Sequence, residues 1–384
     1  MMTNDDAPRV MFNSRIRRSP YFAATRRYGA KAYSTYNHMF LPTYYEDPVA
    51  DYWKLINDVA LWDVGVERQV EITGPDAFAF TNLLTSRDLT QCAVGQCKYV
   101  VITAEDGGII NDPVLLRLGE NHFWLSLSDS DVLLWAKGLA VHAGMDVQVR
   151  EPDVSPVQVQ GPKSKQVTQA LFDDRVLELA YYEFVETELN GMPVVVARTG
   201  WTAEVGYEIY LRDGSYGDEL WETVMAAGKP YNIAPTGPSH IRRMEAGILN
   251  YGNDITLEDN PYQVGLGWLV DLDQEADFVG KAALQRIKAE GVTRNLVGVE
   301  IHGSQPLVPN EEPSWPVSRD GKRIGNLRSF VYSPRLEKTI GYAMVSIEHA
   351  NLGTQLAIET SDGEAEAIVI KKPFMDPKKD VHKS

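Results

Sequence analysis

Two segments of this 384-residue chain repeat one order of elements, a strand that ends in Gly-Pro and a helix that follows it. The first strand ends in Ile72-Thr73-Gly74-Pro75, and the second is Val157-Gln158-Val159-Gln160-Gly161-Pro162. Proline has no backbone N–H, so it ends a strand ladder at the same point in both segments. A helix with an apolar face follows each strand. We therefore expect two related α+β units built on antiparallel sheets.

The end of the chain has a different pattern, in which short strands and turns alternate. A chain of 384 residues exceeds what one hydrophobic core usually serves, so more than one domain is expected. Short strands with regular turns are typical of a small barrel or sandwich. The predicted strands are Leu296 to Ile301, Pro316 to Ser318, Arg323 to Val331, Thr339 to Val345 and Ala365 to Ile370.

Charge and composition point to small-molecule partners. The chain has 37 basic and 53 acidic side chains and a net charge of −16, which argues against binding to nucleic acid or to anionic membranes. Cys92 and Cys97 lack a second pair that would complete a zinc site, so we predict no metal. No apolar run approaches the roughly 20 residues of a membrane span, and the acidic start is unlike a secretory signal. We expect a cytoplasmic protein.

Asp112 lies in the return strand of a predicted hairpin. Residues 94–102 form the first strand, Glu105-Asp106-Gly107-Gly108 the turn, and residues 109–116 the return strand. Pro113 interrupts this strand, and an edge, a bulge or the end of the strand would each explain it. An Asp before Pro is most often a turn residue, so the position alone does not imply catalysis.

Glu208 lies in an alternating run, Tyr207-Glu208-Ile209-Tyr210-Leu211, which is typical of a strand. One interpretation is a surface strand whose Glu faces water. The other is a buried carboxylate that requires hydrogen-bond donors, and a flat heterocycle with adjacent N–H groups would supply them. A similar ambiguity concerns the basic segment around Arg17 and Arg18, which could receive an anionic ligand or pair with surface acids.

Several motifs resemble those of the glycine-cleavage T-protein (aminomethyltransferase) family. Residues 199–209 are similar to its signature Thr-Gly-Tyr-Thr-Gly-Glu-x-Gly-x-Glu-Ile, whose last Glu holds the pterin of tetrahydrofolate and corresponds to Glu208. Residues 107–112 resemble its Gly-Gly-x-(Ile/Leu)-Asp-Asp, whose second Asp is the catalytic carboxylate and corresponds to Asp112. The resemblance implies further folate contacts at Tyr99, Trp201, Tyr251 and Trp268.

The resemblance also implies a three-domain architecture, with two related antiparallel α+β units and a C-terminal small β-barrel. The expected boundaries are a tail over 1–13, a folate-binding core over 14–290, the barrel over 291–376 and a tail over 377–384. From the motifs alone, Tyr251 and Trp268 fit core aromatics as well as ligand contacts.

One departure from the family pattern bears on the reaction. Ser239 occupies the position of an arginine that the T-protein uses near its folate, and serine cannot replace an arginine as a carboxylate partner. Other stretches, such as residues 61–64, 67–70 and 259–262, resemble the folate-dependent dimethylsulfoniopropionate demethylases. We therefore expect no lipoyl-protein partner, and a homodimer is an open possibility.

These resemblances favour methyl transfer from dimethylsulfoniopropionate to tetrahydrofolate. The alternatives are an aminomethyltransferase or a demethylase of another methylated amine or betaine, and a folate-binding protein without turnover. Aromatic faces can hold a sulfonium cation, and arginines can hold the carboxylate of the same donor. The predicted donor contacts are Tyr21, Tyr36, Trp62, Arg17 and Arg18.

Overall fold

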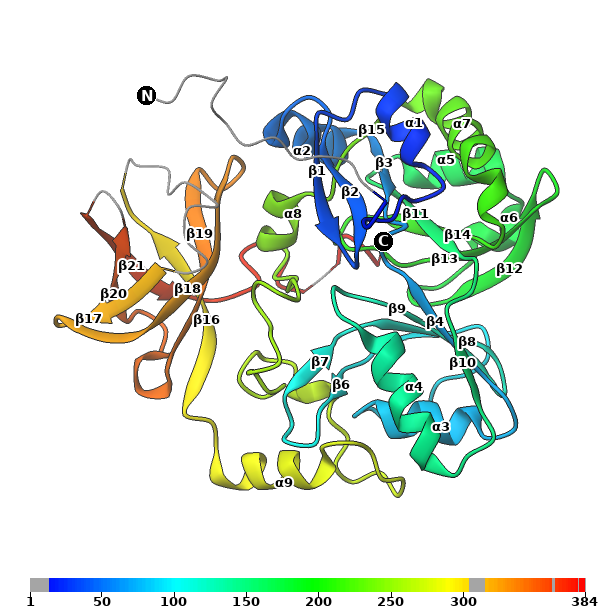
Figure 1. Ribbon diagram of the computed structural model, residues 1–384. Helices are drawn as coiled ribbons and strands as arrows, with labels where there is room; N and C mark the ends of the chain where they lie inside the picture. Colours follow the sequence, from blue (N-terminus) through cyan, green and yellow to red (C-terminus); the bar gives the residue numbers. More distant parts are fainter. Residues whose placement is uncertain (1–13, 304–314, 361–362, 379, 384) are drawn as a thin grey trace.

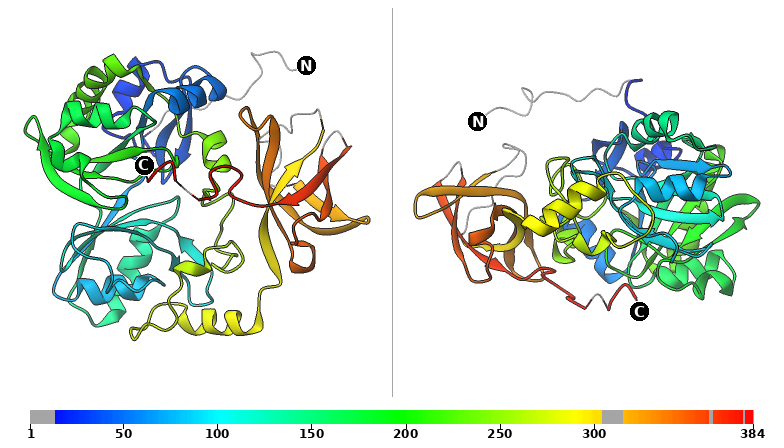
Figure 2. Two further views of the ribbon diagram at one scale, coloured as in Figure 1. Left: turned by 180° about the vertical axis from the view of Figure 1, so that it is seen from behind. Right: turned by 90° about the horizontal axis from the view of Figure 1, so that it is seen from below.

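The structure is a computed structural model that describes residues 14–303, 315–360, 363–378 and 380–383. The predicted tail over residues 1–13 lies outside the described residues. Three units surround a central region that the segment from α8 to α9 crosses (Figure 1). Figure 2 shows the barrel on one side of this region and the two α+β units on the other. Nowhere in the described ranges is a helix both long and apolar enough to cross a membrane.

The first α+β unit is built on an antiparallel five-stranded sheet with the order β10-β4-β9-β8-β5. Phe80 and Leu84 of one helix pack with Val70, Ile72 and Phe123 of the sheet in a common core. The elements are β4 (Gln69–Thr73), α3 (Ala77–Leu84), β5 (Cys97–Tyr99), β6 (Ile102–Thr103), β7 (Ile109–Asn111), β8 (Val114–Gly119), β9 (His122–Ser126), α4 (Val132–Ala143) and β10 (Gln148–Arg150).

The second unit is built on a six-stranded sheet with the order β12-β13-β14-β11-β3-β15, in which only the β3–β15 pair is parallel. Its helices cover one face of the sheet and bury Val167, Leu220 and Trp221. The elements are α1 (Phe22–Arg27), β1 (Ala32–Tyr36), β2 (Met39–Tyr44), α2 (Pro48–Asn57), β3 (Val59–Asp63), β11 (Ser155–Gln160), α5 (Ser164–Leu171), α6 (Asp174–Leu177), β12 (Phe184–Leu189), β13 (Met192–Ala197), β14 (Gly206–Leu211), α7 (Gly217–Gly228), β15 (Ile233–Pro235) and α8 (His240–Glu245). A further helix, α9 (Lys281–Glu290), lies beyond this unit.

The repeated Gly-Pro pattern corresponds to a repeated backbone geometry. Gly74 follows β4 with φ of +122°, and Gly161 follows β11 with φ of +123°. Both values lie in a region that is open to glycine and costly for other residues. Each glycine also lies against backbone, because a Cβ at Gly161 would be 2.7 Å from the carbonyl oxygens of Leu55 and Asp58. The prediction of two related α+β units is confirmed.

The C-terminal unit is a closed barrel with the order β16-β19-β18-β17-β20-β21. Its interior is filled by apolar side chains such as Val299, Leu327 and Ile358. The sequence left a barrel or a sandwich open, and closure through the β17–β20 and β16–β21 pairs decides for the barrel. The strands are β16 (Arg294–Ile301), β17 (Trp315–Arg319), β18 (Lys322–Ser333), β19 (Lys338–Ser346), β20 (Gln355–Thr360) and β21 (Gly363–Ile370). The sequence did not predict β20.

The chain leaves the barrel after β21 and returns toward the second unit (Figure 1). Phe374 stacks on Tyr342 with ring centroids 5.8 Å apart. The backbone N–H of Met375 donates to the carbonyl oxygen of Glu245, at 2.8 Å. This returning segment thereby connects the barrel to α8.

We predict that Gly161→Ala lowers the free energy of unfolding. A positive φ costs a non-glycine residue roughly 1–3 kcal/mol, and the new Cβ would contact two carbonyl oxygens. Denaturant unfolding measures the change. Gly138→Ala in α4 is the matched control, because its Cβ meets no atom within 4 Å and alanine favours helix by about 1 kcal/mol. Equal losses in the two variants would contradict the prediction.

Candidate active site

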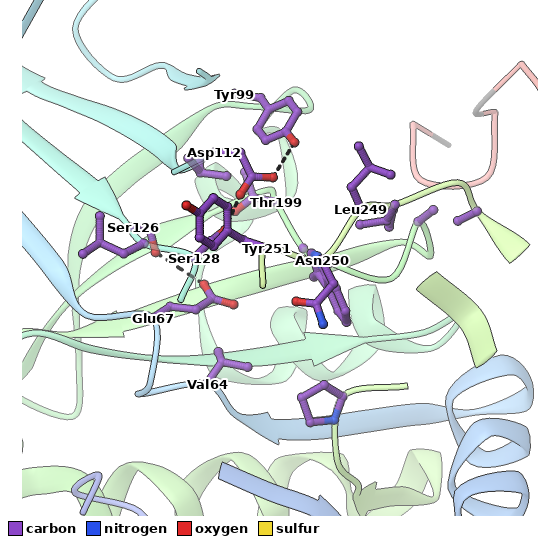
Figure 3. Close-up of a pocket in the computed structure, with 18 of the residues that line it drawn as sticks. Val64, Glu67, Tyr99, Asp112, Ser126, Ser128, Thr199, Leu249, Asn250 and Tyr251 are labelled. Carbon is purple, nitrogen blue, oxygen red and sulfur yellow. Dashed lines mark hydrogen bonds between the residues drawn. The ribbon is translucent and has the colours of Figure 1, made fainter. Parts of the chain in front are cut away.

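A large cavity of about 1070 Å³ lies between the two α+β units, the segment that follows α8 and the returning C-terminal segment. Its walls come from the first unit through Tyr99 and Asp112, and from the second through Glu208. Residues 246–253 and the returning C-terminal segment, including Lys372, complete the lining. Figure 3 shows Asp112, Glu67 and Tyr251 around this space.

A break in the predicted hairpin positions Asp112. The first arm divides into β5 and β6, and the return arm divides into β7 and β8 at Asp112-Pro113. The halves far from the turn, β5 and β8, belong to the five-stranded sheet, whereas β6 and β7 beside the turn form a separate pair. The prediction of two continuous strands is therefore wrong, and Pro113 marks a strand end.

Two hydroxyl groups hold the Asp112 carboxylate. Tyr99 Oη donates to Asp112 Oδ2 at 2.7 Å, and Ser128 Oγ donates to Oδ1 at 2.6 Å. Only 7% of Asp112 is exposed, and burial raises its pKa to about 6, although both hydroxyl bonds oppose this shift. Near neutral pH the group is thus mainly an anion that can take up a proton.

Glu208 lies in the middle of β14, and only 3% of it is exposed. Gln158 Nε2 donates to Oε1 at 2.6 Å, and Tyr210 Oη donates to Oε2 at 2.9 Å. Thr199 Oγ1 also donates to Oε2. Burial raises the pKa of Glu208 despite these three donors. The interpretation as a water-facing surface residue is excluded by this burial.

Besides Tyr99, the other three predicted aromatic contacts also line the cavity. Trp268 is 60% exposed, and the guanidinium of Arg87 lies 5.5 Å from its ring centroid. Trp201 is half-buried and packs against Trp62. Tyr251 lines the cavity and also packs against a core cluster, so its core role is shown and its ligand contact stays a prediction.

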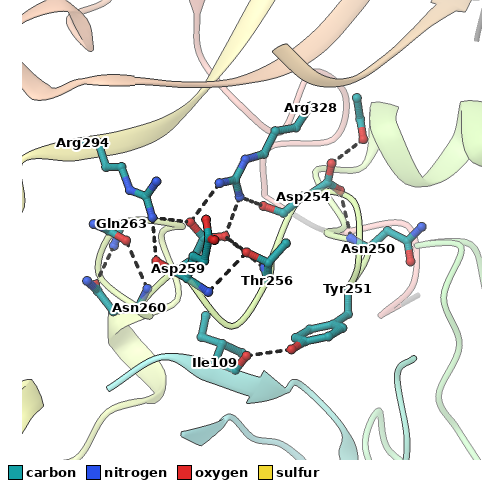
Figure 4. A network of polar contacts seen from close by, with 12 residues as sticks. Ile109, Asn250, Tyr251, Asp254, Thr256, Asp259, Asn260, Gln263, Arg294 and Arg328 are labelled. Carbon is teal, nitrogen blue, oxygen red and sulfur yellow. Dashed lines mark hydrogen bonds and ion pairs between the residues drawn. The ribbon is translucent and has the colours of Figure 1, made fainter. Parts of the chain in front are cut away.

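Tyr251 belongs to a segment that a buried ionic network fixes (Figure 4). Its hydroxyl donates to the carbonyl oxygen of Ile109 at 2.9 Å. Asp259 is fully buried and accepts two hydrogen bonds from Arg328 of the barrel, at 2.5 and 3.0 Å, and one from Arg294 at 3.0 Å. A buried carboxylate with paired donors restricts the backbone around it. The barrel thereby holds one wall of the cavity.

Of the five predicted donor contacts, only Tyr36 lines the cavity. Burial raises its pKa well above the ordinary value, and the charges of Asp112 and Glu67 add to this. The hydroxyl group therefore stays protonated.

The structure places the other four predicted donor contacts elsewhere. Tyr21 is fully buried and donates to the carbonyl oxygen of Ser155, and Trp62 Nε1 donates to Thr236 Oγ1 at 2.6 Å. Arg17 pairs with Glu151 at 2.6 Å. The guanidinium of Arg18 lies 5.1 Å from the ring centroid of Phe22. These four residues are not part of the site proposed below.

Sequence reasoning missed several polar residues of the cavity. Ser128 and Ser126 alternate with Leu127, a pattern that places both hydroxyls on one side of an extended segment. Glu67 stood in a stretch that resembled the demethylases, but it received no role there. Gln158 contacts Glu208 only because β11 pairs with β14, so no local signal marks it. Thr199 opens the 199–209 signature nine residues before Glu208, but it received no role there.

The part of the chain that the structure describes contains no group of three or more His, Cys, Asp or Glu side chains that could hold a metal. Cys92 and Cys97 are both buried and form no disulfide, and burial raises the pKa of each thiol. Glu245, in contrast, accepts hydrogen bonds from Tyr52 and Ser333 and pairs with Arg335. It is a satisfied buried acid that connects α8 to the barrel.

Comparison with known proteins agrees with this architecture. The GCVT N-terminal domain matches residues 21–274, and the glycine cleavage T-protein C-terminal barrel domain matches residues 294–376. The dimethylsulfoniopropionate demethylase of Ruegeria pomeroyi is 38% identical over 91% of this chain and 94% of its own length. The aminomethyltransferase of Clostridium botulinum is 33% identical over 88% of this chain and 92% of its own.

A solved structure has the same fold. The aminomethyltransferase T of the Bartonella henselae glycine cleavage system superposes with a TM-score of 0.84, at 24% identity, over 94% of this chain and 98% of that one. Together with the two domain matches, the full-length relatives define the membership of this protein. The chain belongs to the glycine-cleavage T-protein family, and it is an enzyme of one-carbon transfer.

Proposed function

We propose that this enzyme transfers a methyl group from dimethylsulfoniopropionate to tetrahydrofolate, giving 5-methyltetrahydrofolate and methylmercaptopropionate. The observation that carries the proposal is that two buried carboxyls, Asp112 and Glu208, line one cavity. The demethylase of Ruegeria pomeroyi, which is 38% identical, supports the choice of methyl donor. Both partners in this reaction are small molecules.

The residues of the cavity fit a folate. Glu208 is a buried acceptor for the adjacent N–H donors of a pterin, and Tyr99, Trp201 and Trp268 offer aromatic faces. Two buried polar atoms of the lining lack a hydrogen-bond partner among the described residues, Gln158 Oε1 and Lys372 Nζ. A ligand with both N–H donors and carboxylates, as folate has, satisfies both atoms.

Bound tetrahydrofolate supplies a nitrogen nucleophile. The sulfur–methyl bond breaks with its electron pair left on sulfur, so the cationic sulfonium becomes a neutral thioether. Asp112 provides the negative charge that favours the positive charge arriving at the acceptor nitrogen. With a pKa of about 6, the same carboxylate can accept the proton that this nitrogen loses. A sulfonium is a good leaving group, so positioning by the cavity walls supplies much of the remaining rate enhancement.

Aminomethyl transfer is the second candidate, because relatives named aminomethyltransferase are 33% and 30% identical to this chain. Ser239 argues against it, since its hydroxyl caps α8 by accepting from the backbone N–H of Arg242 and provides no positive charge. We propose that no lipoyl-protein takes part. Demethylation of a betaine or another methylated amine uses the same cavity chemistry.

One assay separates these candidates. Purified enzyme is incubated with tetrahydrofolate and a panel of sulfonium and quaternary ammonium compounds, and 5-methyltetrahydrofolate is measured. We expect dimethylsulfoniopropionate to give the highest kcat/KM. Methyl transfer from a betaine alone would show that the donor is a betaine and not dimethylsulfoniopropionate. Folate binding without turnover of any donor would show a folate-binding protein without enzymatic activity.

We predict that Asp112→Asn lowers kcat about 10²–10³-fold, the usual effect of removing one electrostatic stabiliser, and changes folate affinity much less. Asparagine keeps the shape of the side chain and removes its charge. Steady-state kinetics and calorimetric titration with folate measure the two effects separately. Normal turnover would show that Asp112 is only a turn residue. If Asp112→Asn does not fold, Asp112→Ser serves as the second variant.

The pH dependence gives an independent test of Asp112. The wild-type rate falls as the pH decreases through about 6, because the carboxylate becomes protonated. The contribution of Asp112 to the free energy of unfolding changes with pH in the opposite direction to the rate. It is fully present below the ordinary pKa of about 4 and is lost as the pH rises through about 6, because the native state holds the proton more tightly than the unfolded chain. Asp112→Asn should therefore gain stability relative to wild type more at pH 8 than at pH 5, as unfolding midpoints will show.

We predict that Glu208→Ala weakens folate binding by about 1.5–3 kcal/mol, because the bound ring loses charge-assisted acceptors. Calorimetry measures the loss, and circular dichroism checks that the fold persists. Glu188→Ala is the matched control, since this exposed residue lies on β12 of the same sheet. Unchanged folate affinity in a folded Glu208→Ala protein would remove Glu208 from the site.

A further inference from the structure

Glu67 is a third carboxyl of the cavity, and it has the weakest hydrogen bonds of the three. It lies in the turn between β3 and β4, and its side chain lines the cavity beside Ser126 (Figure 3). Within the described residues, its carboxyl accepts hydrogen bonds from Ser126 Oγ and Gln158 Nε2, both at 3.4 Å. Such long contacts leave most of the acceptor capacity of the carboxyl unused.

Glu67 and Glu208 share one donor unequally. Gln158 Nε2 is 2.6 Å from Glu208 Oε1 and 3.4 Å from Glu67 Oε1, so this amide favours Glu208. Two carboxylates this close cannot both carry a charge at low cost, and the one with better donors keeps it. Burial, together with the charge of Glu208, raises the pKa of Glu67 well above its usual range. Glu67 is therefore the member of the pair that retains a proton.

The described surroundings of Glu67 offer it no cation. The neighbouring Arg68 directs its guanidinium to Glu151, at 3.0 Å from Nε. The ionisable groups that face Glu67 are Tyr36 from β1 and Glu208 and Tyr210 from β14, and the charge of Asp112 also acts on Tyr36. All of them are neutral or negative. A carboxyl with such neighbours and only two distant donors either keeps its proton or requires a cation from outside.

We propose that Glu67 is the counter-ion of the cationic methyl donor and releases its proton to solvent when the donor enters the cavity. This inference rests on the proposed function, because it assumes a sulfonium or quaternary ammonium donor. Tyr36, the one predicted donor contact in the cavity, lies close enough for the charge of Glu67 to affect it, so an aromatic face and a carboxylate are available together.

The proton balance makes the site selective for a charged donor. Donor binding releases one proton and creates an ion pair between Glu67 and the sulfonium. Methyl transfer leaves a neutral thioether, so the ion pair disappears and Glu67 takes up a proton again. The demethylated thioether then binds without a counter-ion, which favours its release. The cavity therefore distinguishes substrate from product by one charge.

Calorimetry tests the proposal. Enzyme saturated with 5-methyltetrahydrofolate, which cannot accept a second methyl group at the same nitrogen, is titrated with dimethylsulfoniopropionate in two buffers of different ionisation enthalpy. The difference in observed heat gives the number of protons released. We expect close to one proton for wild type near pH 7 and none for Glu67→Gln. Glu105→Gln is the control, because it makes the same chemical change at an exposed residue.

Affinities from the same titrations give a second measurement. We expect Glu67→Gln to weaken dimethylsulfoniopropionate binding about 10- to 100-fold, the usual effect of losing a charged partner, while affinity for methylmercaptopropionate changes less than about 3-fold. Glu67→Asp should restore proton release, since it keeps the carboxyl. The proton count for wild type requires no variant and stands even if a substitution impairs folding.

The outcomes separate the two proposals. Binding of dimethylsulfoniopropionate without proton release, or an unchanged preference for the sulfonium over the thioether in Glu67→Gln, overturns the role of Glu67 and leaves the proposed function intact. Failure to bind or demethylate any sulfonium or quaternary ammonium compound overturns both proposals.

Discussion

Pro113 lacks the N–H that would continue a strand ladder, and the arrangement of the cavity depends on this missing donor. The return arm of the hairpin pairs with one partner sheet before Pro113 and with another after it. Asp112 lies where the pairing partner changes and belongs to neither strand. Its carboxylate accepts hydrogen bonds from Tyr99 and Ser128. A residue with an N–H at position 113 would allow a continuous strand, in which the two sheets merge.

Three carboxyls line one cavity and differ in their hydrogen-bond donors; Asp112 and Glu208 are buried, and Glu67 is partly exposed. Glu208 has three protein donors, Asp112 has two, and Glu67 has two distant ones. Hydrogen bonds to a carboxylate favour its charged form, whereas burial favours the neutral form. The number and length of the donors therefore rank the three groups from the most readily charged to the least. A binding role for Glu208, a charge-stabilising role for Asp112 and a protonated resting state for Glu67 follow from this ranking.

Sequence reasoning predicted the parts of this protein that local chemistry determines. The two Gly-Pro strand ends predicted the paired units. The joint site of Tyr99 and Asp112 was implied by the family resemblance, and in the structure the two side chains share a hydrogen bond. Reasoning from residues failed where long-range pairing decides. Trp62 is an aromatic residue of a strand, and only the fold shows that its ring is buried behind Trp201 instead of lining the cavity. The strand β20 was missed although it forms a hairpin with β21, its neighbour in sequence; its pairing with the distant β17, which closes the barrel, could not be read from the sequence.

Arg17 and Arg18 illustrate the same limit for charge. A basic segment in an acidic chain suggests an anionic ligand, yet Glu151, far along the sequence, pairs with Arg17. Lys372 is the converse case: it lines the cavity although sequence reasoning gave it no role, and its ammonium lies 5.4 Å from the ring centroid of Tyr342 with no hydrogen-bond acceptor among the described residues. Charge density along the sequence therefore did not indicate which cations reach the site.

The returning C-terminal segment sets the time at which a newly made chain gains its cavity. Lys372 and Pro373 line the cavity, and Met375 connects to α8 through the carbonyl of Glu245. Synthesis proceeds from the N-terminus, so both α+β units emerge from the ribosome before these residues exist. The nascent protein carries Asp112 and Glu208 long before it has a closed wall beside them. The wall that Lys372 and Pro373 contribute is therefore among the last parts of the cavity to be synthesised, and the cavity is complete only after the chain has crossed back to α8.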